Sequence, residues 1–335
     1  MKDINILVPL DFSDVSVNAL HSAETVAKLY NGRITPFHSY MPVNELNTPY
    51  SFDISTTPME DYEQIEEALM NRLKEMSAAE IDERYLSEPL VSMGNPAQSI
   101  VDHAKDFNMI VMNTHGRTGF SRFFLGSVSE KVLRMAHIPV LIVNKERELS
   151  SFDRILLTTD FSEHSKQAFP IAREIAEKAG STLELLHIVS VEDQDFDEPD
   201  ESVISLRQQR LKLLAKEEFH EISDQIETKV IASSDTPHEA IYNYNINNPH
   251  DLIIMSTVGR TGIEYLMVGS TTANVVRHVN CAVLSINPKS KIEDLEDLFY
   301  TLFIEAITVF LICPVYHFLP QRLRHGTGAA GRKRT

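Results

Sequence analysis

Cysteine is scarce in this chain of 335 residues, which has only Cys281 and Cys313. Two cysteines cannot form the disulfide framework of a small secreted domain, and they fit a reducing compartment. The N-terminus also lacks the layout of a signal peptide, because an apolar run begins within its first five residues. Together these two absences predict a cytoplasmic location.

Basic residues are also few. The 31 lysines and arginines are outnumbered by 48 aspartates and glutamates, which gives a formal net charge of −17 at pH 7. A protein that binds nucleic acid is expected to present a basic surface, so no nucleic-acid partner is predicted. The acidic net charge does not exclude a site for a phosphate-bearing small molecule, because backbone N–H groups at a helix start bind phosphate without lysine.

Three nucleotide-binding signatures are missing. The chain has no G-x-x-x-x-G-K-[ST] run and therefore no P-loop. The spacing of Gly116 and Gly119 differs from G-x-G-x-x-G, so a dinucleotide fingerprint is unsupported. No loop rich in serine and glycine follows the first apolar run, which argues against an adenylating enzyme.

The chain does contain a long internal repeat. Residues 6–13 read Ile-Leu-Val-Pro-Leu-Asp-Phe-Ser and return at 155–162 as Ile-Leu-Leu-Thr-Thr-Asp-Phe-Ser. Gly-Arg-Thr-Gly at 116–119, followed by Gly-Ser at 126–127, returns at 259–262 and 269–270. A repeat of this length indicates a duplicated domain, because each copy can close its own core. We expect copy one at residues 1–146, copy two at residues 151–288, and a tail at 289–335 that is apolar and then basic.

Each copy alternates apolar runs with amphipathic segments. In copy one we expect strands at 4–10, 34–39, 90–93, 109–113 and 138–143, and copy two repeats this order from strands at 154–158 and 183–189. Nearly continuous apolar runs are typical of parallel strands that are covered on both faces. The pattern predicts the α/β class, with two tandem doubly wound parallel five-stranded sheets.

The unusual residues of copy one fall at the expected carboxyl ends of strands, where open parallel sheets bind ligands. Asp11 follows the first strand and would suit a ribose hydroxyl or a phosphate-bound divalent cation, although it could instead cap the next helix. The amides of Gly126, Ser127 and Val128 at a helix start would cradle phosphate, with hydroxyl groups from Ser127 and Ser129.

This pattern resembles the universal stress protein family, whose ATP-binding members carry G-x-x-G, nine residues, and then G-S or G-T. The resemblance covers residues 4–144 and 153–287 and implies a Rossmann-like fold of the adenine nucleotide α-hydrolase-like type. It also implies bound ATP with Mg²⁺, and copies that pair through their final strands. Both copies depart from the pattern at its first glycine, where Asn113 and Ser256 stand.

The resemblance implies nucleotide contacts in both copies. In copy one they are Pro9, Asp11, Ser39, Met112, Asn113, His115, Gly116, Gly126, Ser127, Val128 and Ser129. In copy two they are Thr158, Asp160, Ile188, Met255, Ser256, Val258, Gly259, Gly269, Ser270, Thr271 and Thr272. Asp11 would also approach the Mg²⁺ of a bound nucleotide. Pro9 and His115 favour copy one, whereas Ile188 favours copy two as a contact for adenine.

The resulting prediction is a stress-response protein that binds ATP or another adenine nucleotide in one or both copies, as a switch or interaction module. Asn113 and Ser256 favour an alternative, a stress protein that binds no nucleotide and acts through protein interaction. A slow ATP hydrolase is a second alternative, but only Arg117 or His115 could act at a γ-phosphate, and no catalytic residue is assigned. Protein partners and a homodimer stay open.

Two further features have simpler interpretations. His38 and His187 follow the apolar run of the second strand of each copy and stand near the end of that strand, where we expect packed, hydrogen-bonded histidines rather than metal ligands or acid–base groups. In the tail, residues 298–319 approach the length of a spanning helix, but Glu305 and Pro314 interrupt them. Packing on the body or a partner, disorder, or an extension without evolved function is therefore preferred to membrane contact.

Overall fold

The computed structural model describes residues 4–41, 59–114, 125–144, 147–191, 201–257 and 270–287. The chain divides into a body, Met1–Ser290, and a second unit, Lys291–Thr335. The predicted tail therefore lies outside the described residues. Within the described ranges, no helix is both long enough and apolar enough to cross a membrane.

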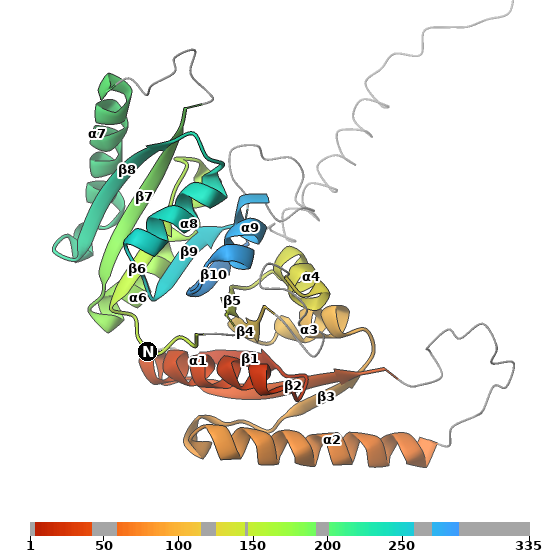
Figure 1. Cartoon of the computed structure of the whole chain (residues 1–335). Coiled ribbons are helices and arrows are strands. Elements are labelled where there is room, and N and C mark those ends of the chain that lie inside the picture. The colour runs from red at the N-terminus through yellow and green to blue at the C-terminus, as the bar shows by residue number, and fades with distance from the viewer. Residues whose placement is uncertain are drawn as a thin grey trace, which may run out of the picture. The chain divides into compact units, whose positions relative to one another are not determined.

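Copy one alternates strands and helices, as its sequence predicts (Figure 1). The elements are β1 Asn5–Pro9, α1 Asp14–Tyr30, β2 Arg33–Tyr40, α2 Met59–Glu80, a 3₁₀ turn Glu83–Tyr85, β3 Leu90–Met93, α3 Pro96–Ala104, β4 Met109–Asn113, α4 Ser127–Met135 and β5 Val140–Val143. The N-cap of α1 is Ser13, whose hydroxyl accepts a hydrogen bond from Ser16 N. Asn31 ends α1 in the left-handed conformation, at φ 52°.

Copy two repeats this order with one change. Its elements are β6 Arg154–Thr158, α5 Glu163–Lys166, α6 Phe169–Ala179, β7 Thr182–Ser190, α7 Glu201–Glu218, a 3₁₀ turn His220–Ile222, β8 Ile226–Ser233, α8 Pro237–Asn247, β9 Leu252–Ser256, α9 Ser270–His278 and β10 Ala282–Ile286. The counterpart of α1 is split into α5 and α6. Pro170 explains the split, because proline lacks the N–H that a helix interior needs but is tolerated in a first turn.

The strands form one sheet in the order β3-β2-β1-β4-β5-β10-β9-β6-β7-β8. Within each copy the neighbouring strands are parallel, which confirms the predicted doubly wound α/β class. The copies join where β5 and β10 pair antiparallel, with Leu141 opposite Leu284. This pairing of final strands is the one that the family resemblance implies.

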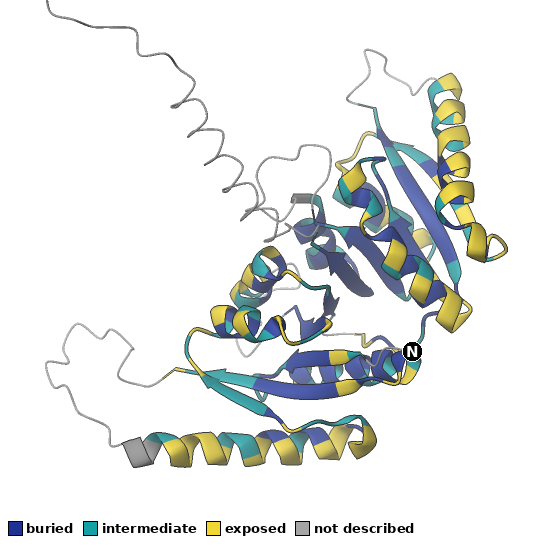
Figure 2. Ribbon diagram, turned by 180° about the vertical axis from the view of Figure 1, so that it is seen from behind, coloured by how far each residue is buried: buried dark blue, intermediate teal, exposed yellow. Residues whose placement is uncertain are grey.

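The inner strands of the sheet are mostly buried, whereas the edge strands β3 and β8 are largely half-buried and the helices keep an exposed outer surface (Figure 2). Ile6, Leu7 and Val8 of β1 are all fully buried. Ile6 and Val8 belong to the apolar cluster on one face of the sheet, and Leu7 belongs to the cluster on the other face. Both clusters contain residues of both copies, so the core continues across the join.

Two equivalent asparagines cross the join in opposite directions. Asn144, just after β5, donates from Nδ2 to Val279 O at 3.0 Å. Asn287, just after β10, donates from Nδ2 to Ala136 O at 2.7 Å. Each amide thus binds the backbone at the end of the last helix of the other copy, and the two bonds fix the register of the join.

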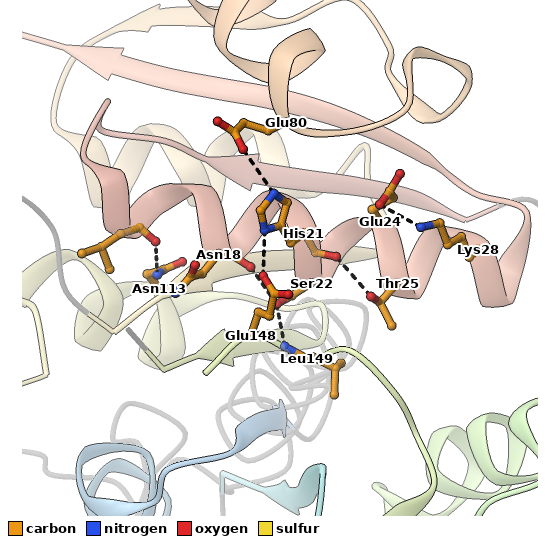
Figure 3. Close-up of polar contacts among 11 residues, drawn as sticks. Asn18, His21, Ser22, Glu24, Thr25, Lys28, Glu80, Asn113, Glu148 and Leu149 are labelled. Carbon is orange, nitrogen blue, oxygen red and sulfur yellow. Dashed lines mark hydrogen bonds and ion pairs between the residues drawn. The ribbon is translucent and has the colours of Figure 1, made fainter. Parts of the chain in front are cut away.

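The linker between the copies is anchored to α1 (Figure 3). The Leu149 backbone N–H donates to the buried hydroxyl oxygen of Ser22 at 2.9 Å. The imidazole of His21 lies between two carboxylates, with Nδ1 2.7 Å from Glu148 Oε2 and Nε2 3.3 Å from Glu80 Oε2. Copy two has no matching anchor on the described part of its split helix, where Pro170 and Ile171 take the places of His21 and Ser22.

Candidate functional site

A cavity of about 260 Å³ opens in copy one at the carboxyl ends of β1, β2 and β4. The strand order reverses at β1, which is where open α/β sheets bind ligands. Every predicted copy-one residue within the described ranges lines this cavity, namely Pro9, Asp11, Ser39, Met112, Asn113, Gly126, Ser127, Val128 and Ser129. His115 and Gly116 lie outside the described residues.

Sequence reasoning missed the remaining lining residues, which are Leu10, Ser16, Phe37, His38, Pro96 and Ile100. Most of them could have been found, because they sit beside predicted residues or at the start of the helix after the third strand. Phe37, Ile100 and Met112 make one wall of the cavity apolar. Residues of the first turn of α4 also line the cavity, and the backbone N–H groups of a first turn have no partner within the helix.

Asp11 supports the start of α1 without being its cap. Its Oδ1 accepts hydrogen bonds from Ser13 N at 3.1 Å and from Ser13 Oγ at 2.6 Å, and Ser13 then caps the helix. Copy two repeats the arrangement, with Asp160 Oδ1 2.9 Å from Ser162 N and 2.6 Å from Ser162 Oγ. The alternative in which the aspartate itself is the cap is therefore wrong in both copies.

The turn that carries Asp11 is held by a stack of three side chains. Phe12 has φ 61°, a left-handed conformation that is uncommon for an aromatic residue. Its ring lies 4.5 Å from the His38 ring and 4.3 Å from the Arg72 guanidinium carbon. His38 Nδ1 lies 2.7 Å from Leu10 O, so the stack connects β1, β2 and α2.

Copy two contains the same stack. Phe161 has φ 64°, and its ring lies 4.2 Å from the His187 ring and 4.3 Å from the Arg210 guanidinium carbon. His187 Nδ1 lies 2.8 Å from Thr159 O. The prediction that His38 and His187 are packed, hydrogen-bonded histidines is confirmed.

The phosphate cradle at the start of α4 is narrower than the sequence predicts. Gly126 is the N-cap of α4, and its amide donates to Thr114 O at 2.7 Å, so this donor is already used within the protein. The Ser129 hydroxyl donates to Asn113 O at 2.7 Å. The amides of Ser127, Val128 and Ser129 are the first-turn donors that helix geometry leaves without an intrahelical partner.

Asn113 stands at the end of β4, where the family pattern has its first glycine. Its side chain is directed at the start of α1, with Nδ2 2.5 Å from Val15 O (Figure 3). Only 7% of the residue is exposed. Its Oδ1 is buried and has no hydrogen-bond partner among the described residues.

The predicted residues of copy two lie at the matching places. Thr158, Asp160, Ile188, Met255 and Ser256 stand at or just beyond the ends of β6, β7 and β9, and Ser270, Thr271 and Thr272 begin α9. Thr272 Oγ1 donates to Ser256 O at 2.9 Å, which mirrors the bond from Ser129 to Asn113. Val258, Gly259 and Gly269 lie outside the described residues.

A second polar cluster is buried in copy two, at the opposite edge of the sheet. Glu184 near the start of β7 accepts from the Tyr244 hydroxyl and lies 3.0 Å from His250 Nε2, while His250 Nδ1 lies 3.0 Å from Asn245 Oδ1. Burial opposes the charge of Glu184, but the hydrogen bonds from His250 and Tyr244 outweigh it and lower the pKa of the carboxyl group. Burial also raises the pKa of the Cys281 thiol to about 12.

This cluster does not have the chemistry of a nucleophilic site. Cys281 Sγ contacts Asn245 Nδ2 at 3.5 Å, and at neutral pH its high pKa keeps it a thiol rather than the reactive thiolate. Both ring nitrogens of the fully buried His250 face oxygen acceptors within the protein. The cluster therefore connects β7, α8 and the turn that precedes β9, and it serves the fold.

No metal centre is evident from the side chains alone. Over the described ranges, no three His, Cys, Asp or Glu side chains gather so as to hold a metal ion. The contact between Asp11 and a nucleotide-bound Mg²⁺ stays a prediction.

The fold and the cavity together define a tandem doubly wound α/β protein with a ligand-sized cavity at the switch point of one half. The model of the universal stress protein family matches residues 5–144 and 151–287. The chain therefore belongs to the universal stress protein family and carries two copies of its domain.

Relatives and solved structures agree with this assignment. Universal stress protein MJ0531 of Methanocaldococcus jannaschii is 35% identical over 147 residues, which is 43% of this chain and 83% of the relative. A universal stress protein of Mycolicibacterium smegmatis is 24% identical over 301 residues, covering 86% of this chain and 98% of the relative. The crystal structure of a universal stress protein from Archaeoglobus fulgidus, 25% identical, covers 86% of this chain and all of its own chain, with a TM-score of 0.62.

Proposed function

We propose that copy one binds an adenine nucleotide in the cavity at the ends of β1, β2 and β4, and acts as a nucleotide-dependent switch or interaction module. The observation that carries this proposal is that the cavity lining has three chemically different parts. Apolar side chains form one wall, a carboxylate stands at the end of β1, and the first turn of α4 supplies backbone amides. These three parts match the base, sugar and phosphates of a nucleotide.

Each part has a physical reason to bind its portion of the ligand. Phe37, Ile100 and Met112 offer apolar surface to a planar base. Asp11 offers a carboxylate oxygen to a sugar hydroxyl, and the stack at Phe12 keeps its turn in place. The α4 amides carry the positive end of a helix dipole, so they attract phosphate even though the chain as a whole is acidic. ATP with Mg²⁺ is the form that we propose.

Binding without rapid turnover fits these residues best. Hydrolysis needs groups that orient water and stabilise charge at the γ-phosphate. Among the described residues that line the cavity there is no lysine or arginine. We therefore propose binding as the function and keep slow ATP hydrolysis as the lesser alternative.

One observation favours a second candidate function. Asn113 places a side chain where the family pattern has glycine, and it lines the cavity. A chain in which this side chain excluded nucleotide would act through protein interaction alone.

Binding can be tested in the full chain. Native mass spectrometry of freshly purified protein should show a bound adenine nucleotide, and titration calorimetry with ATP and MgCl₂ should show binding. Asp11→Ala should weaken that binding about tenfold or more, because it removes a charged hydrogen-bond acceptor. Asp160→Ala is the matched change in copy two.

The two variants separate the possible outcomes. A loss only in Asp160→Ala would move the site to copy two. No retained nucleotide together with no heat of binding would contradict the proposal and leave protein interaction as the function.

A further inference from the structure

We infer that the outer edge of β8 is a surface on which a second copy of this chain can pair, and that the side chain of Gln208 keeps this edge closed. β8 is the last strand of the described sheet and spans eight residues. The backbone groups at a sheet edge pair readily with a further strand. The inference concerns contact between chains and does not depend on nucleotide binding.

Alternate residues of β8 direct their backbone groups toward this edge. Gln225 O, just before the strand, accepts a hydrogen bond from Leu183 N of β7. Ser233 O, at the end of the strand, accepts from Val191 N. The odd-numbered residues therefore face β7, and because direction alternates along a strand, the even-numbered residues face outward. The outward-facing residues are Ile226, Thr228, Val230 and Ala232.

The Gln208 amide occupies the middle of the edge. Gln208 belongs to α7, which lies beside β8 (Figure 1). Its Nε2 donates to Thr228 O at 3.1 Å and to Thr228 Oγ1 at 2.9 Å, and its Oε1 accepts from Val230 N at 3.0 Å. A carbonyl group and the N–H two residues further on are the groups that one residue of a neighbouring parallel strand would bind. The side chain thus takes the place of a strand at this point.

The opposite edge of the sheet has a different protection. β3 has only four residues, and Pro89 before it has no N–H to offer to another strand. Counted from the equivalent stacking arginines, α2 has Met70 where α7 has Gln208. The amide therefore stands at the longer of the two edges, where a further strand would find the most partners.

The sequence of β8 favours a second copy as the occupant. When two copies pair antiparallel around Thr228, Glu227 lies opposite Lys229 of the partner subunit, and both side chains are exposed. Opposite charges at facing positions of two strands stabilise the pair. This register also places Thr228 opposite its own counterpart, so Gln208 must release the Thr228 carbonyl before a second copy can pair.

The test measures the mass of the full chain in solution by sedimentation equilibrium over a wide range of protein concentration. In Gln208→Ala the mass should rise with concentration toward about twice that of the unaltered chain, because a two-fold pair uses the same edge on both subunits. Gln209→Ala is the matched control. It removes an exposed amide from the next position of α7 and should leave the mass unchanged.

Two further changes in Gln208→Ala identify the surface that pairs. Lys229→Glu places like charges opposite each other and should abolish the association. Adding Glu227→Lys to that variant exchanges the two charges and should restore the association. Urea unfolding of each variant confirms that the chain is folded.

Hydrogen exchange in the unaltered chain gives evidence that needs no variant. The Val230 N–H has Gln208 as its acceptor, so NMR should show it exchanging about tenfold or more slowly than the outward-facing Thr228 N–H. Equal exchange at these two positions would show that Gln208 does not close the edge.

The mass measurements can overturn the inference as well. An unchanged mass in a folded Gln208→Ala chain would show that a second copy does not pair at β8. Association that persists after Lys229→Glu would belong to another surface. In either case the proposed nucleotide binding of copy one is unaffected.

Discussion

Copy one and copy two agree at one edge of the sheet and differ at the other. At the carboxyl ends of the strands both have the aspartate–serine turn and the stack of arginine, phenylalanine and histidine. At the amino ends, copy two buries the charged Glu184 where copy one has Thr35. The geometry next to the candidate site is thus common to both halves, whereas at the amino ends of the strands copy one has a neutral side chain and copy two a charged one.

The first helix is a second difference between the copies. α1 runs without a break from Asp14 to Tyr30 and receives the linker through Ser22. Its counterpart is interrupted before Pro170 and makes no such contact in the described residues. The linker is therefore part of the structure of copy one, although it joins both copies.

The largest effect is expected at the ionic cluster of copy two. Glu184→Ala leaves His250 buried without its carboxylate partner, so the free energy of unfolding should fall by about 3–5 kcal/mol. The matched change Thr35→Ala in copy one should cost about 1 kcal/mol or less, because no charge is exposed to an apolar interior. Urea unfolding followed by circular dichroism measures the free energy of unfolding of both variants. Equal losses in Glu184→Ala and Thr35→Ala would contradict the proposed difference between the copies.

The same cluster predicts a dependence on pH. The pKa of Glu184 is lower in the folded chain than in the unfolded chain, so its contribution to stability is full above the unfolded value. That contribution is lost as the pH falls through the lower folded value. In Glu184→Gln the stability should therefore change less between pH 6 and pH 3 than in the unaltered chain, by urea unfolding at each pH.

The next largest loss of stability is expected at the stack of arginine, phenylalanine and histidine, which both copies contain. Phe161→Ala should cost about 3 kcal/mol, and Phe12→Ala somewhat less because Phe12 is less deeply buried. Both positions have positive φ, so glycine should be more stable than alanine there by about 1 kcal/mol. Thermal unfolding of the four variants would test this order. Alanine that proves more stable than glycine at either position would refute the argument from φ.

A smaller effect is expected at the linker anchor, which belongs to copy one alone. Ser22→Ala leaves the Leu149 N–H buried without its acceptor and should cost about 1–2 kcal/mol. His21→Ala removes contacts to two partly exposed carboxylates and should cost about 0.5 kcal/mol. Urea unfolding can rank the two variants, and the reverse order would show that the ionic contact dominates the anchor.

Much of the fold could be predicted because its signal is local. The strand predicted at 109–113 coincides with β4, whose residues are all buried, since a buried parallel strand is a continuous apolar run. The strand predicted at 90–93 coincides with β3, which is a half-buried edge strand. Helical spacing alone does not predict which apolar residues of a helix are buried. Ile65 shares helical spacing with the buried Leu73 of α2 but is 42% exposed.

The polar details of the site were harder to predict because they depend on contacts between distant residues. The Asn113 amide reaches Val15 across 98 positions of sequence, and no pattern near residue 113 indicates this contact. Gly126 was expected to offer its amide to phosphate, but the bond to Thr114 O uses that donor. Such hydrogen bonds form only when folding brings the strand ends together, so the sequence of one segment does not predict them.

The antiparallel join of β5 and β10 has a consequence for how the two halves can change. In a dimer of identical chains, a substitution alters both subunits at once, so both sites must tolerate it. Here the two pairing strands belong to one polypeptide, and the pairing needs no second molecule and does not weaken on dilution. A substitution can therefore be inherited by one half alone. Positions 113 and 256 are equivalent and differ in this way, with asparagine in one half and serine in the other.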